Sequence, residues 1–232
     1  MGYYPIFVEL EGRRVLVVGG GAVAAQKMRN LHPAGPAITV IAPELKDEMT
    51  QYHAEGQFDW VQREYGEGDV EGYDLVMVAT DDGAVNKQVS SEARAHKIWV
   101  NAADDIPNCD FILPSMVRRG SLVLAASTGG GSPALARRVR ETLEGAFGPW
   151  WGDLADVMRE MREETRQRRV MFTPDAWKEA MDPTFMRLVY QGQREEAKDR
   201  LRTRLDEQGF EPLPGKLHEF DRSRAGVAGG GD

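Results

Sequence analysis

A glycine-rich turn that follows a short apolar run constrains the fold of this chain more than any other feature. Residues 14–18 read Arg-Val-Leu-Val-Val, a pattern typical of a parallel strand covered on both faces. The turn Gly19-x-Gly21-x-x-Ala24 follows directly and has the spacing of a dinucleotide-binding turn that opens a helix. Such glycines allow a tight bend and a close approach of a pyrophosphate, which the helix N-terminus holds. The alternative is a turn that merely connects a strand to a helix.

The rest of the first half alternates apolar runs with helical patterns, which favours an α/β fold with a parallel sheet. The order of these segments predicts a Rossmann-type, doubly wound parallel sheet. The further strands are predicted over residues 38–41, 58–63, 75–79 and 98–100, and the helices over residues 23–31 and 83–96.

The pattern changes after the fifth predicted strand. Two apolar runs, residues 111–113 and 122–125, flank the turn-like residues 118–120, which predicts an antiparallel β-ribbon. Ser132-Pro133 then predicts a helix start, because serine caps helices and proline suits their first position. From residue 149 on the pattern is helical, so we expect a small all-helical C-terminal domain.

Acidic residues follow the fourth and fifth predicted strands, at the edge where parallel strands line a ligand crevice. They lie in Thr80-Asp81-Asp82 and in residues 101–105. A carboxylate at this edge can serve as a general base, or it can simply cap a turn or a helix. After the second strand, Glu44 is displaced from the usual place of the ribose-binding acid, and no arginine stands there for a 2′-phosphate. We therefore expect NAD rather than NADP.

The segment Ser127-Thr-Gly-Gly-Gly-Ser132 opens the next helix and is a second place where backbone N–H groups would meet an anion. Several arginines lie close to it in sequence and would together form a wall that binds a polyanion. The alternative is a solvated helix face with ordinary turn arginines. The arginines are Arg118, Arg119, Arg137, Arg138 and Arg140.

Composition excludes several other classes of protein. The net charge of −8 argues against general nucleic-acid binding, and no apolar run approaches the roughly 20 residues of a membrane span. The N-terminus does not read as a signal peptide. With Cys109 as its single cysteine the chain has no disulfide framework, and we expect it in the cytoplasm. The spacing of histidines and cysteine offers no dedicated metal site.

Several motifs taken together resemble the precorrin-2 dehydrogenase family, the N-terminal module of siroheme synthases. The resemblance is close over about residues 1–145, whereas the helical remainder is similar only in general character. Besides the glycine turn, it is carried by Tyr4-Pro-Ile-Phe7, Ala79-Thr-Asp-Asp82, Val100-Asn-Ala-Ala-Asp104, Phe111-Ile-Leu-Pro-Ser115 and Ser127-Thr-Gly-Gly-x-Ser-Pro-Ala-Leu-Ala136.

This resemblance implies that precorrin-2 is oxidised to sirohydrochlorin, with NAD as hydride acceptor. It also implies a homodimer, and no fused methyltransferase domain is expected in 232 residues. The expected organisation is an NAD-binding Rossmann domain over 1–112, a dimerisation segment over 113–146, a helical domain over 147–210 and a disordered tail over 211–232.

The resemblance and the motifs together nominate the site residues. The family's proposed general base falls on Asp104, and its substrate carries many carboxylates, which suits arginines beside a helix N-terminus. The NAD-binding residues are expected to be Gly19, Gly21, Ala22, Val23, Pro43, Glu44, Thr80, Asp81 and Asn101. The substrate-binding residues are expected to be Ser115, Arg118, Thr128, Gly129, Gly130 and Arg137.

Three other functions remain open on the sequence. Some family members also insert Fe²⁺ into sirohydrochlorin, so the chain could be both a dehydrogenase and a chelatase for Fe²⁺ or Co²⁺. It could instead be a nucleotide-sensing Rossmann module, although this would leave the segments 101–104 and 127–136 unexplained. A third possibility is an NADP enzyme that acts on another anionic substrate.

Overall fold

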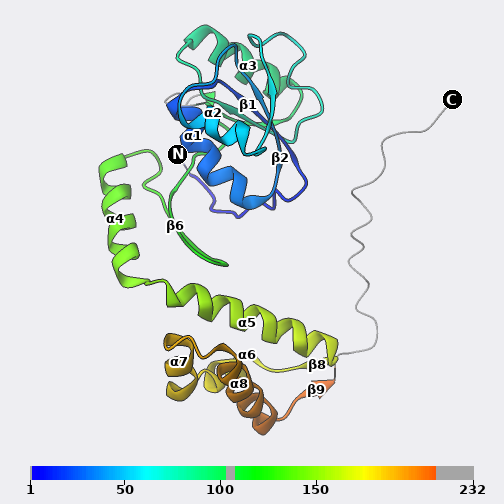
Figure 1. Cartoon of the computed structure of the whole chain (residues 1–232), viewed down its shortest axis with the longest axis vertical. Coiled ribbons are helices and arrows are strands. Elements are labelled where there is room, and N and C mark those ends of the chain that lie inside the picture. Colours follow the sequence, from blue (N-terminus) through cyan, green and yellow to red (C-terminus); the bar gives the residue numbers. More distant parts are fainter. Residues whose placement is uncertain (1, 103–107, 213–232) are drawn as a thin grey trace, which may run out of the picture. The chain divides into compact units, whose positions relative to one another are not determined.

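The computed structural model describes residues 2–102 and 108–212 (Figure 1). The chain forms two compact units, the first within Met1–Pro114 and Ser127–Ala136, and the second within Ser115–Ala126 and Arg137–Asp232. The segment 113–146 is thus divided between the two units. No helix among the described residues is long and apolar enough to cross a membrane.

The first unit is built on a five-stranded parallel sheet with the order β3-β2-β1-β4-β5, which confirms the predicted Rossmann-type topology. The central strand pairs on both sides, so that Val17 lies beside Val40 and Met77. The strands are β1 (Arg14–Val18), β2 (Ala37–Ile41), β3 (Asp59–Val61), β4 (Leu75–Val78) and β5 (Trp99–Ala102).

The two faces of the sheet carry separate hydrophobic cores, which is why its strands read as continuous apolar runs. Val15 and Val17 point to the face that also buries Met28 of α1 (Ala22–Leu31). Leu16 and Val18 point to the other face, with residues of α3 (Gly83–Ala95). Helices therefore cover both faces, as a doubly wound sheet requires.

The region between β2 and β4 differs from the sequence prediction. Helix α2 (Glu48–Ala54) was not predicted, because this mostly polar helix of seven residues buries only Met49 and shows little apolar periodicity. A short 3₁₀ helix, η1 (His32–Ala34), extends α1. Residues 62–74 connect β3 to β4 without a helix, and Val70 from this connection is fully buried in the sheet core.

The second unit begins with an antiparallel ribbon of β6 (Ser115–Arg119) and β7 (Leu122–Ala126). The predicted ribbon was right, but its first strand was wrongly placed at residues 111–113. Arg118 and Arg119 lie in β6, and the turn is formed by Gly120 and Ser121. Pro114 precedes β6, and because proline has no N–H to donate, the ladder starts after it.

Helix α5 (Trp150–Gln167) packs against this ribbon and also contacts the later helices of the second unit. A Cβ atom on Gly152 would lie 2.8 Å from the backbone oxygen of Arg119, so glycine lets the helix and the ribbon turn approach closely. Ser121 Oγ donates a hydrogen bond to Asp156 of α5, and Arg119 donates to the carbonyl of Phe147 over 3.0 Å.

A helical bundle completes the second unit (Figure 1). Its core includes Met161, Phe185, Leu201 and Leu205, all of them essentially inaccessible to solvent. A two-stranded ribbon, which the sequence did not predict, closes it at residues 211–212, inside the segment expected to be a disordered tail; the rest of that tail lies outside the described residues. Besides α5, the bundle consists of α6 (Pro174–Ala180), α7 (Pro183–Tyr190), α8 (Arg194–Gln208), β8 (Val170–Met171) and β9 (Glu211–Pro212). Helix α4 (Pro133–Ala146), which precedes α5, buries none of its residues.

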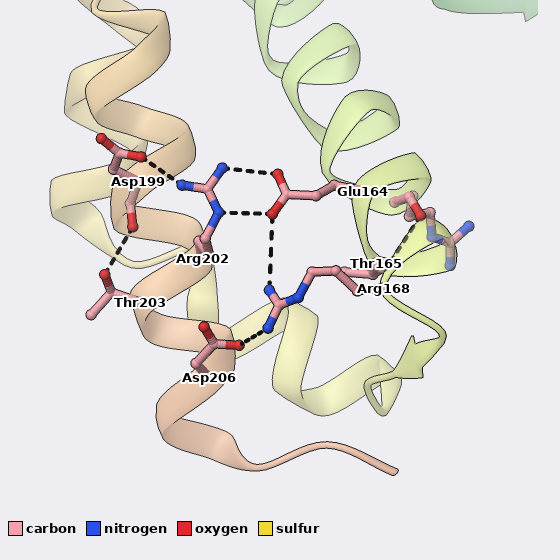
Figure 2. Close-up of polar contacts among 8 residues, drawn as sticks. Glu164, Thr165, Arg168, Asp199, Arg202, Thr203 and Asp206 are labelled. Carbon is pink, nitrogen blue, oxygen red and sulfur yellow. Dashed lines mark hydrogen bonds and ion pairs between the residues drawn. The ribbon is translucent and has the colours of Figure 1, made fainter. Parts of the chain in front are cut away.

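An ion-pair network joins α5 to α8 (Figure 2). Arg202 donates two hydrogen bonds to the carboxylate of Glu164, each 2.8 Å long. Arg168 lies against Glu164 and donates to Asp206 over 3.0 Å. The hydrogen bond from Arg202 is the main cause that lowers the pKa of Glu164. Nearby, Lys198 and Arg194 lower the pKa of Glu160 to about 2.

We expect acid to weaken this helical bundle. A glutamate with a depressed pKa in the folded protein stabilises the fold above its ordinary pKa of 4.5, and this contribution disappears as the pH falls through the lowered value. Glu164→Gln should therefore lower the free energy of unfolding by up to about 1 kcal/mol at pH 7, and by much less at pH 2–3. Chemical denaturation at both pH values measures the difference.

The neighbouring variant Glu163→Gln is the matched control, because the contacts of Glu163 are exposed: a pair of 3.8 Å with Arg166 and a hydrogen bond of 3.3 Å from Gln167. It should change stability little at either pH. An equal loss of stability for Glu164→Gln at pH 7 and at pH 2–3 would contradict the electrostatic explanation.

Candidate functional site

A cleft of about 520 Å³ lies where the carboxyl ends of β1, β2 and β4 meet. Parallel α/β sheets bind ligands at this edge because the strand order reverses there. Eight of the nine predicted NAD-binding residues line it, all except Asn101. They are Gly19, Gly21, Ala22, Val23, Pro43, Glu44, Thr80 and Asp81.

The three glycines of the turn have different reasons to be glycine. Gly19 has a positive φ of 117°, and a Cβ atom there would lie 2.3 Å from the carbonyl oxygen of Ala79. Gly20 packs against the loop after β2, where its Cβ would lie 2.2 Å from the carbonyl oxygen of Glu44. A Cβ on Gly21 would meet no protein atom within 4 Å. The first two are needed by the fold, whereas Gly21 borders open space in the cleft.

The N-terminus of α1 opens into this cleft and suits a phosphate. Gly21 is the N-cap and offers no side chain to cap the helix, and its carbonyl accepts the N–H of Ala25 over 3.1 Å. Within residues 2–102 and 108–212, no acceptor is recorded for the N–H groups of Ala22 and Val23. Unpaired N–H groups and the helix dipole attract an anion, so the turn fits a dinucleotide pyrophosphate.

The loop after β2 brings both signs of charge to the cleft. Glu44 and Lys46 line it, and the Lys46 N–H donates to the carbonyl of Gly20 over 2.9 Å, which ties this loop to the glycine turn. Glu64 and Tyr65, which follow β3, line it as well. Sequence reasoning missed Lys46, Glu64 and Tyr65, although their places just after two strand ends were a signal.

Tyr65 is fixed in the wall of the cleft. Its hydroxyl donates a hydrogen bond to Glu92 of α3. Burial and then this hydrogen bond raise the pKa of Tyr65. The phenol therefore stays neutral and acts as a fixed wall of the cleft rather than as a proton donor or acceptor at neutral pH.

Asp81 and Asp82 follow β4 and both line the cleft, but they have different roles. Asp82 is the N-cap of α3 and accepts the N–H of Ala84 over 2.8 Å, so for this carboxylate the capping alternative is right. Thr80 Oγ donates to Asn86 Oδ1 over 2.6 Å, which holds the same loop. Asp81 is exposed and lines the cleft.

Asn101 lies in a buried polar cluster at the end of β5 and does not line the cleft. Its amide donates to the carbonyl of Phe111 over 2.9 Å and accepts from Lys27 of α1, whose side chain is also buried. The thiol of Cys109 bonds the backbone of Ala102 within this cluster. Asn101 thus has a structural role, and its contact with NAD stays a prediction. Asp104 lies outside the described residues.

Two hydroxyl groups of the loop before α4 accept hydrogen bonds from the backbone of the loop and of the helix. Thr128 Oγ accepts the N–H of Ser132 over 3.0 Å, and Ser132 Oγ caps α4 through the N–H of Leu135. Gly129 and Gly130 both have positive φ values, 63° and 82°. The predicted helix start is confirmed, while the binding of substrate by Thr128, Gly129 and Gly130 stays a prediction.

The other predicted substrate residues belong to the second unit. Ser115 and Arg118 lie on β6, and Arg118 is exposed. Arg137, on α4, donates to Glu141 of the same helix over 3.1 Å and is largely exposed. For Arg137 the structure therefore favours a solvated helix face.

The part of the chain that the structure describes offers no candidate metal centre. Within the described residues, no group of three or more histidine, cysteine, aspartate or glutamate side chains is placed to hold a metal ion.

Comparisons with known proteins point to one family. Residues 6–115 match a family model described as putative NAD(P)-binding. A siroheme synthase of Photorhabdus laumondii is 41% identical over 89% of this chain and 44% of its own length. A siroheme synthase of Nitrosococcus oceani is 37% identical over 94% of this chain and 47% of its own length. The chain spans less than half the length of these relatives.

One solved structure is matched along the whole of its own length. A precorrin-2 dehydrogenase, SirC, is 29% identical with a TM-score of 0.67, over 87% of this chain and the whole of its own. This match extends beyond the Rossmann-type unit into the helical part of the chain.

Proposed function

Because this chain belongs to the family of precorrin-2 dehydrogenases and siroheme synthases, we propose that it oxidises precorrin-2 to sirohydrochlorin with NAD. The observation that carries the proposal is the dinucleotide cleft, in a chain that matches SirC over that protein's full length. A nucleotide-sensing module would need the cleft alone and would leave the match in the helical part without a reason.

The residues of the cleft bind and orient the cofactor. When bound, NAD supplies a hydride acceptor, so the protein has to hold the nicotinamide against the tetrapyrrole and receive a proton. The N–H groups of Ala22 and Val23 hold the pyrophosphate, and the tight bend at Gly19 aims α1 at it. The loops after β2 and β3 enclose the other end of the cofactor.

The charges around the cleft favour NAD over NADP. Glu44 and Glu64 both line it, and carboxylates repel the 2′-phosphate that distinguishes NADP. Lys46 lies in the same wall but is a single cation, whereas Asp81 and Asp82 bring the carboxylates that line the cleft to four. We therefore propose that the enzyme prefers NAD.

Asp104 is the proposed proton acceptor. Bound NAD would accept the hydride that precorrin-2 loses, and the proton lost with it would need an acceptor, which a carboxylate can provide. The substrate carboxylates would be met by the predicted residues Ser115, Arg118, Thr128, Gly129, Gly130 and Arg137.

The assay that tests this function follows precorrin-2 by absorbance with purified protein and NAD. We expect sirohydrochlorin to form with NAD and much more slowly with NADP. Unchanged precorrin-2 in the presence of either cofactor would refute the proposal. A strong preference for NADP would refute the proposal that Glu44 and Glu64 repel the 2′-phosphate of this cofactor.

Metal insertion is the second candidate activity, and the name siroheme synthase of the relatives favours it. The metal, Fe²⁺ or Co²⁺, would be a substrate, so a chelatase needs no resident metal site. Insertion into sirohydrochlorin is measured with and without the enzyme. A rate no faster than the spontaneous one excludes this activity.

We also propose that the protein is a homodimer of the cytoplasm. Helix α4 buries none of its residues, and its apolar side chains Leu135 and Val139 are 54% and 37% exposed. Because they recur on one face, they form an apolar stripe that fits a second copy of the chain. The single cysteine, Cys109, suits a reducing compartment.

The double variant Leu135→Asp/Val139→Asp is expected to convert the dimer into a monomer. Each aspartate would have to be buried in an apolar interface without a partner, which costs several kcal/mol. Light scattering coupled to gel filtration measures the mass. Lys178→Asp, on the exposed surface of α6, is the control and should leave the mass unchanged; a dimer that survives the double variant would exclude α4 from the interface.

A further inference from the structure

A second large cleft lies entirely within the helical unit. It has a volume of about 840 Å³ and is lined by α5 and the start of α6. This volume falls within the range of roughly 300–1,000 Å³ that is usual for small-molecule sites. The activity proposed above does not use this cleft.

One face of α5 lines the cleft with cations. Arg159, Arg162 and Arg166 follow one another at helical spacing, so they project from the same side of the helix. The opposite side of α5 carries Leu154 and Val157 into the bundle core. The three guanidinium groups are spread over about 10 Å along the helix axis.

These arginines are weakly engaged within the protein. Arg159 is 3.6 Å from Asp156 and Arg166 is 3.8 Å from Glu163, and their side chains are 64% and 73% exposed. No ion pair of Arg162 is recorded within residues 2–102 and 108–212. Surface pairs of this kind contribute little, so the three cations are available to a ligand.

The contrast with the other side of α5 is direct (Figure 2). Arg202 grips Glu164 through two hydrogen bonds of 2.8 Å, and Arg194 lies 2.5 Å from Glu160. The arginines that join the helices are therefore neutralised by close carboxylates, whereas those in the cleft are not. Glu163 is the one acidic residue in the lining.

The rest of the lining is apolar. Trp177 and Met158 are half-buried in the cleft wall, and Trp177 is fixed by an edge-on contact with Phe172 at 6.2 Å. An indole offers a flat surface to an unsaturated ring, while guanidinium groups bind carboxylates in a planar, bidentate manner. Together they suit a conjugated ring with carboxylates around its rim.

We propose that this cleft is a second binding site for a polycarboxylate tetrapyrrole, separate from the nucleotide cleft. Arg159, Arg162 and Arg166 bind carboxylates of the ligand, and Trp177 contacts its ring. The choice of a tetrapyrrole rests on the proposed function, whereas the preference for a ring with several carboxylates rests on the lining itself. Such a site would hold substrate or product on the enzyme before or after the reaction.

The test uses uroporphyrin, a stable porphyrin that carries carboxylates around its rim, and the full-length protein. Equilibrium dialysis at low salt measures the number of porphyrins bound per chain and their affinity. We expect the double variant Arg162→Gln/Arg166→Gln to bind one porphyrin fewer per chain, and each single variant to weaken that site at least about tenfold. Arg187→Gln, an exposed arginine of α7 outside the cleft, is the matched control and should bind like the wild type.

Several outcomes overturn the assignment. Equal stoichiometry and affinity in the wild type and the double variant would remove the site. Binding of poly-glutamate that depends on Arg162 and Arg166, without binding of uroporphyrin, would assign the cleft to an acidic protein segment instead. Melting temperatures of the variants must match the wild type, which shows that the bundle is folded.

Precorrin-2 turnover, measured on the same preparations at saturating substrate, separates this inference from the proposed function. We expect the double variant to keep its kcat, because none of the residues that line this cleft is among those proposed for the reaction. Turnover together with unchanged porphyrin binding would overturn the second site alone. Absence of turnover in the wild type, with porphyrin binding that depends on the arginines, would overturn the proposed reaction alone.

Discussion

Replacement of Gly21 by valine is expected to abolish NAD binding and leave the Rossmann-type unit folded. Gly21 has an extended backbone, with φ −97° and ψ −166°, which valine adopts readily. A Cβ atom there meets no protein atom within 4 Å, so the new side chain would project into the space for the pyrophosphate. We expect NAD affinity to fall at least about 100-fold, measured by titration calorimetry, with little change in melting temperature.

A variant of the neighbouring Gly20 distinguishes an effect on the stability of the fold from an effect on NAD binding. Gly20→Ala would place a Cβ atom 2.2 Å from the carbonyl oxygen of Glu44, so this variant should lose about 1–3 kcal/mol of stability. Gly145→Ala, in α4 with open space around it, should change neither property. Wild-type affinity in Gly21→Val would mean that the dinucleotide does not approach the turn.

The second large effect is expected at Asp104. A positioned general base typically contributes about 10²–10⁴-fold to a rate, so Asp104→Ala should lower the turnover of precorrin-2 by this factor. NAD binding should be retained, since the residues proposed to hold the pyrophosphate and the ribose are other ones. Steady-state kinetics and NAD titration on the same preparation measure the two effects.

Asp81→Asn is the matched comparison, because Asp81 is an exposed carboxylate that lines the cleft after β4 and, unlike Asp82, is not the N-cap of α3. We expect it to change the affinity for NAD more than turnover. If Asp81→Asn lost turnover and Asp104→Ala kept it, the base would lie after β4 and the assignment of Asp104 would be wrong.

Much of the first unit was predictable because its signals are local. Residues 15–18 are apolar throughout since a central parallel strand is covered on both faces, and Gly19 is needed where φ is positive. Local patterns also explain two helix starts of the second unit, where Thr173 and Asp182 each precede a proline and cap α6 and α7. In these cases the reason for the residue lies within a few positions along the chain.

Other features depend on contacts between distant segments. Gly20 looks like part of a flexible turn, yet it is required because the loop after β2 packs against it. Asn101 reads as a cleft residue beside Asp104, but its amide is held by Lys27 and Phe111 in a buried cluster. The first ribbon strand begins at Ser115, which pairs with Ala126 of β7, and not at residue 111.

The sequence by itself determined the parallel α/β fold, the dinucleotide turn and the family, since each is written in short runs of adjacent residues. Only the tertiary structure decided which arginines are available to a ligand. Arg166 and Arg202 are alike in sequence, but Arg202 meets Glu164 across two helices, whereas Arg166 faces a cleft. Whether an arginine is paired depends on the carboxylates that distant segments of the chain place beside it. Such contacts cannot be inferred from the residues that neighbour the arginine in sequence.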